Sequence, residues 1–184
     1  MIEVEIKAKV QSLEPIKEKL LSLAAELLKT EKQVDRVFGR VKDLDQEHKV
    51  IEGFFSARIR GRGEKRNVEF KEINRTGVGM EFSSPLSSVE SGINFLTKLG
   101  FEEAFTILKV REIYKYKDFE ICLDDVEQLG LFIEVEYPLK NDGDRTGALK
   151  ECQDLLNLVA PNATVEPKKY GDLMQEVINK HKED

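Results

Sequence analysis

Ionisable side chains recur two positions apart along five segments of this 184-residue chain. The groups are Glu3, Glu5 and Lys7; Arg58 and Arg60; Glu69 and Lys71; Lys109 and Arg111; and Glu134 and Glu136. Residues i and i+2 of a β-strand point to the same side, so each group would share one face of a strand. A single such pair is ordinary on the solvated face of an antiparallel sheet. Like-charged pairs on several strands repel one another, and their repetition favours a shared polar site that holds a charged ligand.

The residue types in these groups suit a polyanion that is bridged to a divalent cation. Arginine can grip phosphate oxygens with two hydrogen bonds, and lysine adds a compact positive charge. Carboxylates supply the hard oxygen ligands that Mg²⁺ and Mn²⁺ bind. Phosphoryl chemistry needs mainly positioning and charge neutralisation, which such a site supplies without histidine or cysteine. The pattern therefore indicates a site for a nucleotide or an inorganic triphosphate.

Sequence periodicity predicts an α+β fold in which an antiparallel sheet carries the charged groups. Alternation of apolar and polar residues predicts eight strands, at about 2–10, 32–38, 54–60, 67–73, 80–83, 104–116, 118–126 and 131–137. Apolar residues at helical spacing predict four helices, at about 12–27, 87–99, 146–159 and 170–180. Closing such a sheet into a barrel with the helices outside would bring all the charged faces into one lumen.

The formal net charge of −6 conceals an uneven distribution of charge along the chain. Residues 53–75 carry seven basic and three acidic side chains, whereas residues 118–144 carry nine acidic side chains and one lysine. An acidic balance argues against the coating of bulk nucleic acid. We therefore expect the basic segment and the acidic segment to meet in one site.

The sequence has no apolar run of the length that a membrane-spanning helix needs, and we expect no membrane partner. Two cysteines, Cys122 and Cys152, cannot make a disulfide framework and lack metal-ligand spacing, so a cytoplasmic setting is expected. Both cysteines are predicted to be small core residues. Tyr170, at the start of the last helix, is expected to serve in packing, with capping of the mouth of the lumen as the alternative. Four basic residues near hairpin ends are expected to face solvent: Arg62, Lys65, Arg66 and Arg75.

The charged segments together resemble the CYTH superfamily, also called triphosphate tunnel metalloenzymes. The resemblance covers the family's ExExK signature, paired-arginine strand, lysine strand, later basic pair and acidic hairpin, found here in that order at residues 3–7, 57–60, 68–71, 109–111 and 123–136. It extends over about residues 1–173 and is greatest to the class IV (CyaB-type) adenylyl cyclases. It implies one CYTH-like domain over residues 1–184, with residues 174–184 as a helical tail.

The resemblance also implies an eight-stranded antiparallel closed β-barrel with helices packed outside, and a set of site residues inside it. The implied ligands of Mg²⁺ or Mn²⁺ are Glu3, Glu5, Asp124, Glu134 and Glu136. The implied triphosphate-binding residues are Lys7, Arg58, Arg60, Lys71, Lys109 and Arg111. The implied catalytic residues are Lys7, Asp124 and Glu136.

Three functions fit this constellation. The first is an adenylyl cyclase-like, metal-dependent enzyme that converts ATP to cyclic AMP and pyrophosphate. The second is a triphosphatase that hydrolyses tripolyphosphate, thiamine triphosphate or a nucleoside triphosphate. The third is a non-catalytic module that binds nucleotide or polyphosphate. One set of charges would serve both reactions, so the sequence does not distinguish a cyclase from a triphosphatase. It also leaves open whether the protein forms a homodimer.

Overall fold

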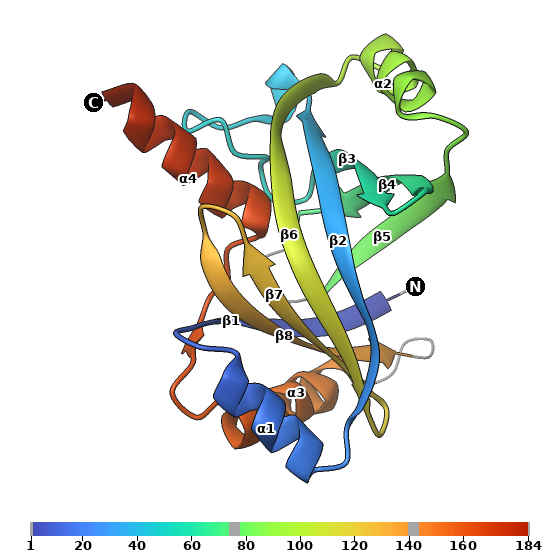
Figure 1. Ribbon diagram of the computed structural model, residues 1–184. Helices are drawn as coiled ribbons and strands as arrows, with labels where there is room; N and C mark the ends of the chain where they lie inside the picture. Colours follow the sequence, from blue (N-terminus) through green and yellow to red (C-terminus); the bar gives the residue numbers. More distant parts are fainter. Residues whose placement is uncertain (1, 74–77, 140–143, 184) are drawn as a thin grey trace.

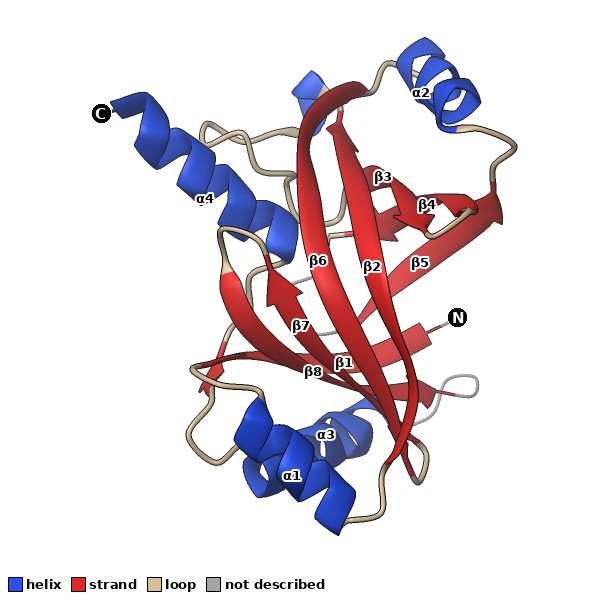
Figure 2. Ribbon diagram, viewed as in Figure 1, coloured by secondary structure: helices blue, strands red, loops and turns tan. Residues whose placement is uncertain are grey.

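The computed structural model of the chain describes residues 2–73, 78–139 and 144–183. Within these ranges the strands are β1 (Ile2–Val10), β2 (Glu26–Gly39), β3 (Phe55–Arg62), β4 (Lys65–Glu72), β5 (Val78–Pro85), β6 (Glu102–Tyr116), β7 (Phe119–Val126), β8 (Gly130–Leu139) and β9 (Thr164–Val165). The helices are α1 (Glu14–Ser22), α2 (Val89–Lys98), α3 (Arg145–Val159) and α4 (Tyr170–Glu183), with a 3-10 turn at Val41–Asp43. The strands form one curled antiparallel sheet in the order β5-β4-β3-β2-β6-β7-β8-β1-β9 (Figures 1 and 2).

The expected closed, eight-stranded barrel is wrong, because the sheet has nine strands and is not closed into a barrel. The physical reason lies at β1, which pairs with β8 along residues 2–10. Its other edge is divided: residues 2–4 pair with residues 78–80 of β5, whereas Ala8 and Lys9 pair with Val165 and Thr164 of β9. Within the described residues β5 meets β1 over three residue pairs, and β9 pairs with a separate part of the same edge, so neither strand accompanies β1 along its length.

Alternation along the strands gives the sheet an apolar outer face and a charged inner face. On β8, Ile133 and Val135 belong to a buried cluster with Leu20 of α1 and Leu156 of α3. Glu134 lies between them in sequence and therefore points to the opposite side of the strand. Helices α1 and α3 cover this outer face near β1 and β8 (Figure 1). The period-two pattern of the sequence thus correctly separates the core side of the sheet from its polar side.

Two further helices cover other parts of the sheet. Leu96 of α2 is buried in a cluster with Ile59 of β3. Met174 of α4 is buried with Ile107 and Phe132, which lie on the same side of β6 and β8 as the charged residues two positions along. Helix α4 therefore closes one end of the charged inner face (Figure 1).

The predicted first helix is too long, because α1 ends at Ser22 and Leu27 lies in β2. Ala24 adopts a positive φ of 56°, and the amide of Ala25 donates to the carbonyl of Leu20. This six-to-one hydrogen bond is typical of a helix-terminating Schellman motif, in which the chain turns away from the helix axis. No helix in the described part of the chain is long and apolar enough to cross a membrane.

Candidate functional site

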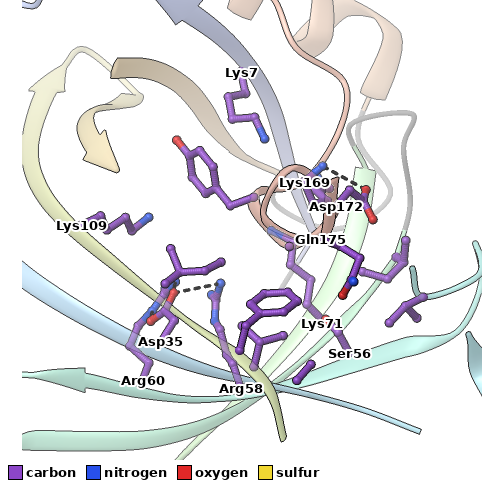
Figure 3. Close-up of a pocket in the computed structure, with 18 of the residues that line it drawn as sticks. Lys7, Asp35, Ser56, Arg58, Arg60, Lys71, Lys109, Lys169, Asp172 and Gln175 are labelled. Carbon is purple, nitrogen blue, oxygen red and sulfur yellow. Dashed lines mark hydrogen bonds and ion pairs between the residues drawn. The ribbon is translucent and has the colours of Figure 1, made fainter. Parts of the chain in front are cut away.

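A cavity of about 990 Å³ lies along the inner face of the sheet. Strands β1, β2, β3, β4, β6 and β8 line it together with the segment that leads into α4. Figure 3 shows Asp35, Arg58 and Arg60 grouped on one side of the cavity, with Lys7 and Lys169 across from them. The charged groups that are far apart in the sequence therefore meet in one place.

Opposite charges face one another across adjacent strands of this inner face. The directly opposed pairs are Asp35 and Arg60, Arg58 and Glu69, Lys71 and Glu81, Arg111 and Asp124, and Lys7 and Glu134. Opposite charges in such positions stabilise a sheet, and like charges would destabilise it. The strand register therefore gives each of these cations a carboxylate partner.

Asp35 and Arg60 form a buried ion pair at the centre of the basic side. Arg60 Nε and Nη2 donate to the two Asp35 oxygens at 2.6 and 2.5 Å. Burial alone would raise the pKa of Asp35, but the hydrogen bonds from Arg60 and the charge of Arg58 hold it well below its usual range. Arg58 is more exposed and donates to Glu69 at 2.6 Å and to Glu81 at 3.0 Å.

Asp124 is fully buried behind a second group of cations. Its oxygens accept hydrogen bonds from Arg111 at 2.6 and 2.5 Å, from Lys109 at 3.1 Å and from the Tyr170 hydroxyl at 2.8 Å. Burial and the neighbouring charge of Arg111 lower the pKa of Lys109 to about 8, against the opposing attraction of Asp124. Asp124 thus holds three side chains that reach the cavity, but does not line the cavity itself.

Carboxylates of like charge occupy one register row across three strands. Glu5 of β1 lies opposite Glu136 of β8, which lies opposite Glu120 of β7. Ligand atoms of Glu120, Glu136 and Cys122 all lie within 4.8 Å of one another. Burial would raise the pKa of Glu5, but Lys71, whose Nζ lies 3.4 Å away, and Lys169, which donates a hydrogen bond to it, lower it to about 2.

This row fits a divalent cation by the chemistry of its donors. Ionised carboxylates are the oxygen ligands that Mg²⁺ and Mn²⁺ bind, and a cation offsets the repulsion between neighbouring carboxylates. Burial raises the pKa of the Cys122 thiol well above its ordinary value. Sulfur is also a soft ligand that suits Mg²⁺ and Mn²⁺ poorly compared with carboxylate oxygen. The glutamates therefore supply the metal-binding capacity of the row.

Comparison with known proteins agrees with this geometry. The family model of the CYTH domain matches residues 1–168. The chain belongs to the CYTH family. The family includes adenylate cyclase-like enzymes and triphosphatases, which are metal-dependent and act on nucleoside or inorganic triphosphates.

Several relatives share this CYTH fold. A Methanocaldococcus jannaschii protein named "putative adenylate cyclase" is 32% identical over 162 residues, which cover 85% of this chain and 88% of that protein. A solved structure from Pyrococcus horikoshii OT3 is 25% identical, covers 93% of this chain and 98% of its own, and superimposes with a TM-score of 0.77. A Hippeastrum protein with a described dominant triphosphatase activity is 16% identical, covers 96% of this chain and 95% of its own, and has a TM-score of 0.68. This last likeness shows a shared CYTH fold alone.

The structure brings nearly all the sequence-predicted site residues of this CYTH chain together. Those that line the cavity are Glu5, Lys7, Arg58, Arg60, Lys71, Lys109, Arg111, Glu134 and Glu136. Asp124 lies behind them. The backbone of Glu3 belongs to β1, but its side chain lies outside the described part of the structure.

Sequence reasoning missed several residues of the CYTH cavity. Glu31, Gln33 and Asp35 line it from β2, where period-two spacing within a longer predicted strand could have revealed them. Lys169 has no such signal, because it precedes α4 and reaches the cavity only through the tertiary fold. Tyr170 does pack against Phe132, at 5.1 Å between ring centroids, but packing is only part of its role, since it also lines the cavity and binds Asp124.

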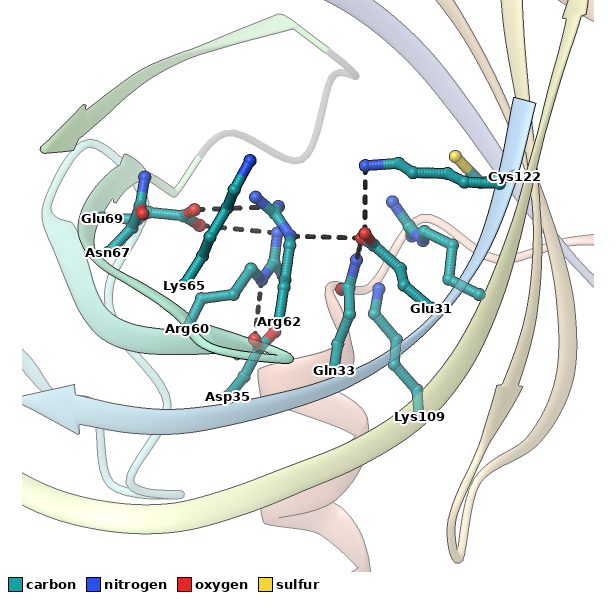
Figure 4. Close-up of polar contacts among 12 residues, drawn as sticks. Glu31, Gln33, Asp35, Arg60, Arg62, Lys65, Asn67, Glu69, Lys109 and Cys122 are labelled. Carbon is teal, nitrogen blue, oxygen red and sulfur yellow. Dashed lines mark hydrogen bonds and ion pairs between the residues drawn. The ribbon is translucent and has the colours of Figure 1, made fainter. Parts of the chain in front are cut away.

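The expectation that Arg62 faces solvent is wrong, because it lines the cavity next to Glu31. Figure 4 shows Arg62 and Arg60 side by side above β2. Arg75, which is also expected to face solvent, lies outside the described residues. Hairpin ends are ordinarily solvated, but the curl of this sheet turns the end of β3 toward the inner face.

Removal of the Asp35–Arg60 ion pair is expected to destabilise the folded protein. Asp35→Asn should reduce the free energy of unfolding by about 3 kcal/mol at pH 7, because the buried Arg60 loses the carboxylate that accepts two of its hydrogen bonds. Glu69, at 3.4 Å, remains as its second anion and keeps the loss at the lower end of the range for a broken buried pair. Glu103→Gln is the matched control: Glu103 also accepts two hydrogen bonds from one arginine, Arg36, but about a third of each side chain is exposed. Glu103→Gln should reduce the free energy of unfolding by no more than about 1 kcal/mol. Urea unfolding of the two variants measures the difference.

The same pair gives the sign of the pH dependence. The pKa of Asp35 is lower in the folded protein than in the unfolded chain, so the unfolded chain binds more protons in acid. The stabilisation is complete above the unfolded value of about 3.9 and is lost as the pH falls below it. The difference between the wild type and Asp35→Asn should therefore shrink in acid. A difference that is constant with pH would contradict this linkage.

Proposed function

We propose that this CYTH protein is a metal-dependent enzyme that acts on a triphosphate in the inner-face cavity, with cyclisation of ATP to cyclic AMP and pyrophosphate as its leading reaction. One observation carries the proposal: basic side chains from five strands and a row of carboxylates line the same cavity. The name of the Methanocaldococcus relative, at 32% identity, supports the cyclase assignment.

In this proposal the basic side chains bind the phosphate chain, and they differ in how far each is exposed to an incoming ligand. Arg58 and Lys71 each expose 23% of the side chain and would meet an incoming phosphate first. Arg60 and Lys109 are more deeply buried and are held in place by Asp35 and Asp124. Fixed cations of this kind stabilise charge that develops during phosphoryl transfer without reorganising at the moment of reaction.

Lys7 lies between the basic and acidic sides and completes the proposed phosphate-binding set. Its Nζ donates to the carbonyl of Lys168 and lies 4.3 Å from the centre of the Tyr170 ring. Burial lowers the pKa of Lys7, although Glu134 and Glu5 oppose this effect. We assign Lys7 to charge stabilisation at the reacting phosphate. Asp124 acts as a positioning residue, since its contacts pass through Arg111, Lys109 and Tyr170.

The proposed metal ligands are Glu5, Glu134 and Glu136, together with Glu120 of the carboxylate row. Of the other two ligands predicted from the sequence, the Glu3 side chain lies outside the described structure, and Asp124 is instead engaged by Arg111, Lys109 and Tyr170. A divalent cation bound there would lower the pKa of the attacking hydroxyl and offset negative charge on the phosphates. The carboxylates themselves orient that cation relative to the phosphate chain. Lys169 and Lys71 at Glu5 supply positive charge on the same side of the cavity.

Cyclisation and hydrolysis differ in which phosphorus is attacked. In cyclisation the ribose 3′-oxygen bonds to the α-phosphorus, the bond from that phosphorus to the bridging oxygen breaks, and pyrophosphate leaves. In hydrolysis, water attacks the terminal phosphorus and orthophosphate leaves. The deciding experiment incubates the protein with ATP and Mg²⁺ or Mn²⁺ and identifies the products. Cyclic AMP with pyrophosphate is expected; orthophosphate would assign a triphosphatase, and the absence of turnover with any triphosphate would leave a binding module.

The metal assignment predicts the behaviour of Glu5→Gln. This variant should lose metal-dependent turnover while still folding, because the amide is a poor cation ligand. Its thermal unfolding temperature should fall by a few degrees, since the ion pairs of Glu5 with Lys71 and Lys169 are lost, and its circular dichroism spectrum should match that of the wild type. Glu112→Gln is the matched control, since Glu112 also accepts a hydrogen bond from a lysine, Lys17, but lies away from the cavity. Retained turnover in Glu5→Gln would remove Glu5 from the metal site.

The phosphate assignment predicts the behaviour of Lys71→Gln. Loss of a charge-assisted hydrogen bond of about 1.5–3 kcal/mol should weaken the binding of tripolyphosphate about tenfold or more. Lys65→Gln, an exposed lysine on the same strand, should bind as the wild type does. Isothermal titration calorimetry measures both affinities. Equal affinities in the two variants would place Lys71 outside the phosphate site.

A further inference from the structure

Gln33 is a buried polar residue on the cavity wall that the proposed phosphate and metal sites do not use. It lies on β2 with 2% of its surface exposed and lines the cavity. Its neighbours across the sheet are Arg62 on β3 and Lys109 on β6. A buried side-chain amide with an unused hydrogen-bonding atom is costly, and such groups in folded proteins ordinarily have a partner.

The orientation of the Gln33 amide is fixed by Glu31. Gln33 Nε2 donates to Glu31 Oε1, and the reverse orientation would place two acceptor oxygens against each other. Burial raises the pKa of Glu31, but Lys29 and the bond from Gln33 more than offset this, so the net shift is downward and the residue stays ionised. Gln33 Oε1 is therefore left as the atom that is available for another partner.

No described residue donates a hydrogen bond to Gln33 Oε1, although the atom is buried. Of the two nearest cations by register, Lys109 donates to Asp124 at 3.1 Å. Arg62 forms an ion pair with Glu31 at 3.2 Å, although its buried Nε, like Gln33 Oε1, makes no hydrogen bond within the described structure. Figure 4 shows the Gln33 amide directed at the Glu31 carboxylate, with the Lys109 side chain beside it.

Gln33 Oε1 favours a ligand group that donates a hydrogen bond at this patch. Ionised phosphate oxygens only accept hydrogen bonds, so they could not satisfy Gln33 Oε1. The charge of Glu31 is already balanced by Lys29 at 3.0 Å and Arg62 at 3.2 Å, so the discrimination rests on the hydrogen bond rather than on net charge. The nearby cations Arg60 and Lys109 favour phosphate. A ligand that fills both regions therefore carries phosphates at one end and a hydroxyl or amine donor at the other.

We propose that Gln33 is a specificity-determining residue that accepts a hydrogen bond from the non-phosphate part of an organic triphosphate, and so favours a nucleoside triphosphate over inorganic triphosphate. This inference rests on the proposed function, since it assigns part of the substrate class of the same cavity. Buried acceptors discriminate well, because a ligand that lacks the donor leaves them without a partner.

The test compares two ligands in one variant. Gln33→Met keeps the length of the side chain and removes the acceptor, and calorimetry with Mg²⁺ measures the affinities for α,β-methylene ATP and for tripolyphosphate. We expect the ATP analogue to bind about three- to tenfold more weakly while tripolyphosphate affinity stays unchanged. The ratio of the two affinities is independent of the fraction of folded protein, so partial unfolding cannot imitate the result.

Gln175→Met is the matched control, since Gln175 is also buried and lines the cavity but donates to Asn179 within α4. Its affinity ratio should equal that of the wild type. Equal weakening of both ligands in Gln33→Met, or no change in either, would overturn the role of Gln33 and leave the proposed function standing. A wild-type protein that binds neither ligand would overturn both.

Discussion

The structure depends on the pairing of opposite charges across the strands of a curled sheet. A buried charge is tolerated only with a partner, and an inner face with so many ionisable residues could not fold without one. Strand register supplies these partners in direct opposition, as in Asp35 with Arg60 and Asp124 with Arg111. The charges that equip the cavity for a polyanion are thus also the contacts that hold its strands in register.

The carboxylates of the cavity divide into two kinds. Asp35 and Asp124 are buried and fully engaged by arginine, so their part is to fix cations in place. Glu5 and Glu136 stand in a row of like charge, where a lysine or a metal cation must offset repulsion. The same functional group therefore positions cations at one side of the cavity and, in the proposed function, would offer ligands to a metal at the other.

The C-terminal segment completes the cavity, although it contributes little to the sheet. β9 takes part of the free edge of β1, and α4 packs on the inner face through Met174. Between them, Lys169 reaches Glu5 and Tyr170 reaches Asp124. The chain thus returns to the edge of its own first strand, where β9 and β5 pair with separate parts of β1.

The sequence by itself determined the α+β class, most strand positions and the charged groups at i and i+2, because period-two patterning reports which side of a strand faces the core. It also indicated membership of the CYTH family, through short motifs that occur in a fixed order. Only the tertiary structure showed that the sheet is not closed into a barrel, that Asp124 is buried, and that Lys169, Arg62 and Gln33 line the cavity. Those features depend on register and on edge pairing between segments far apart in the chain, and local periodicity holds no information about which strand a given edge will meet.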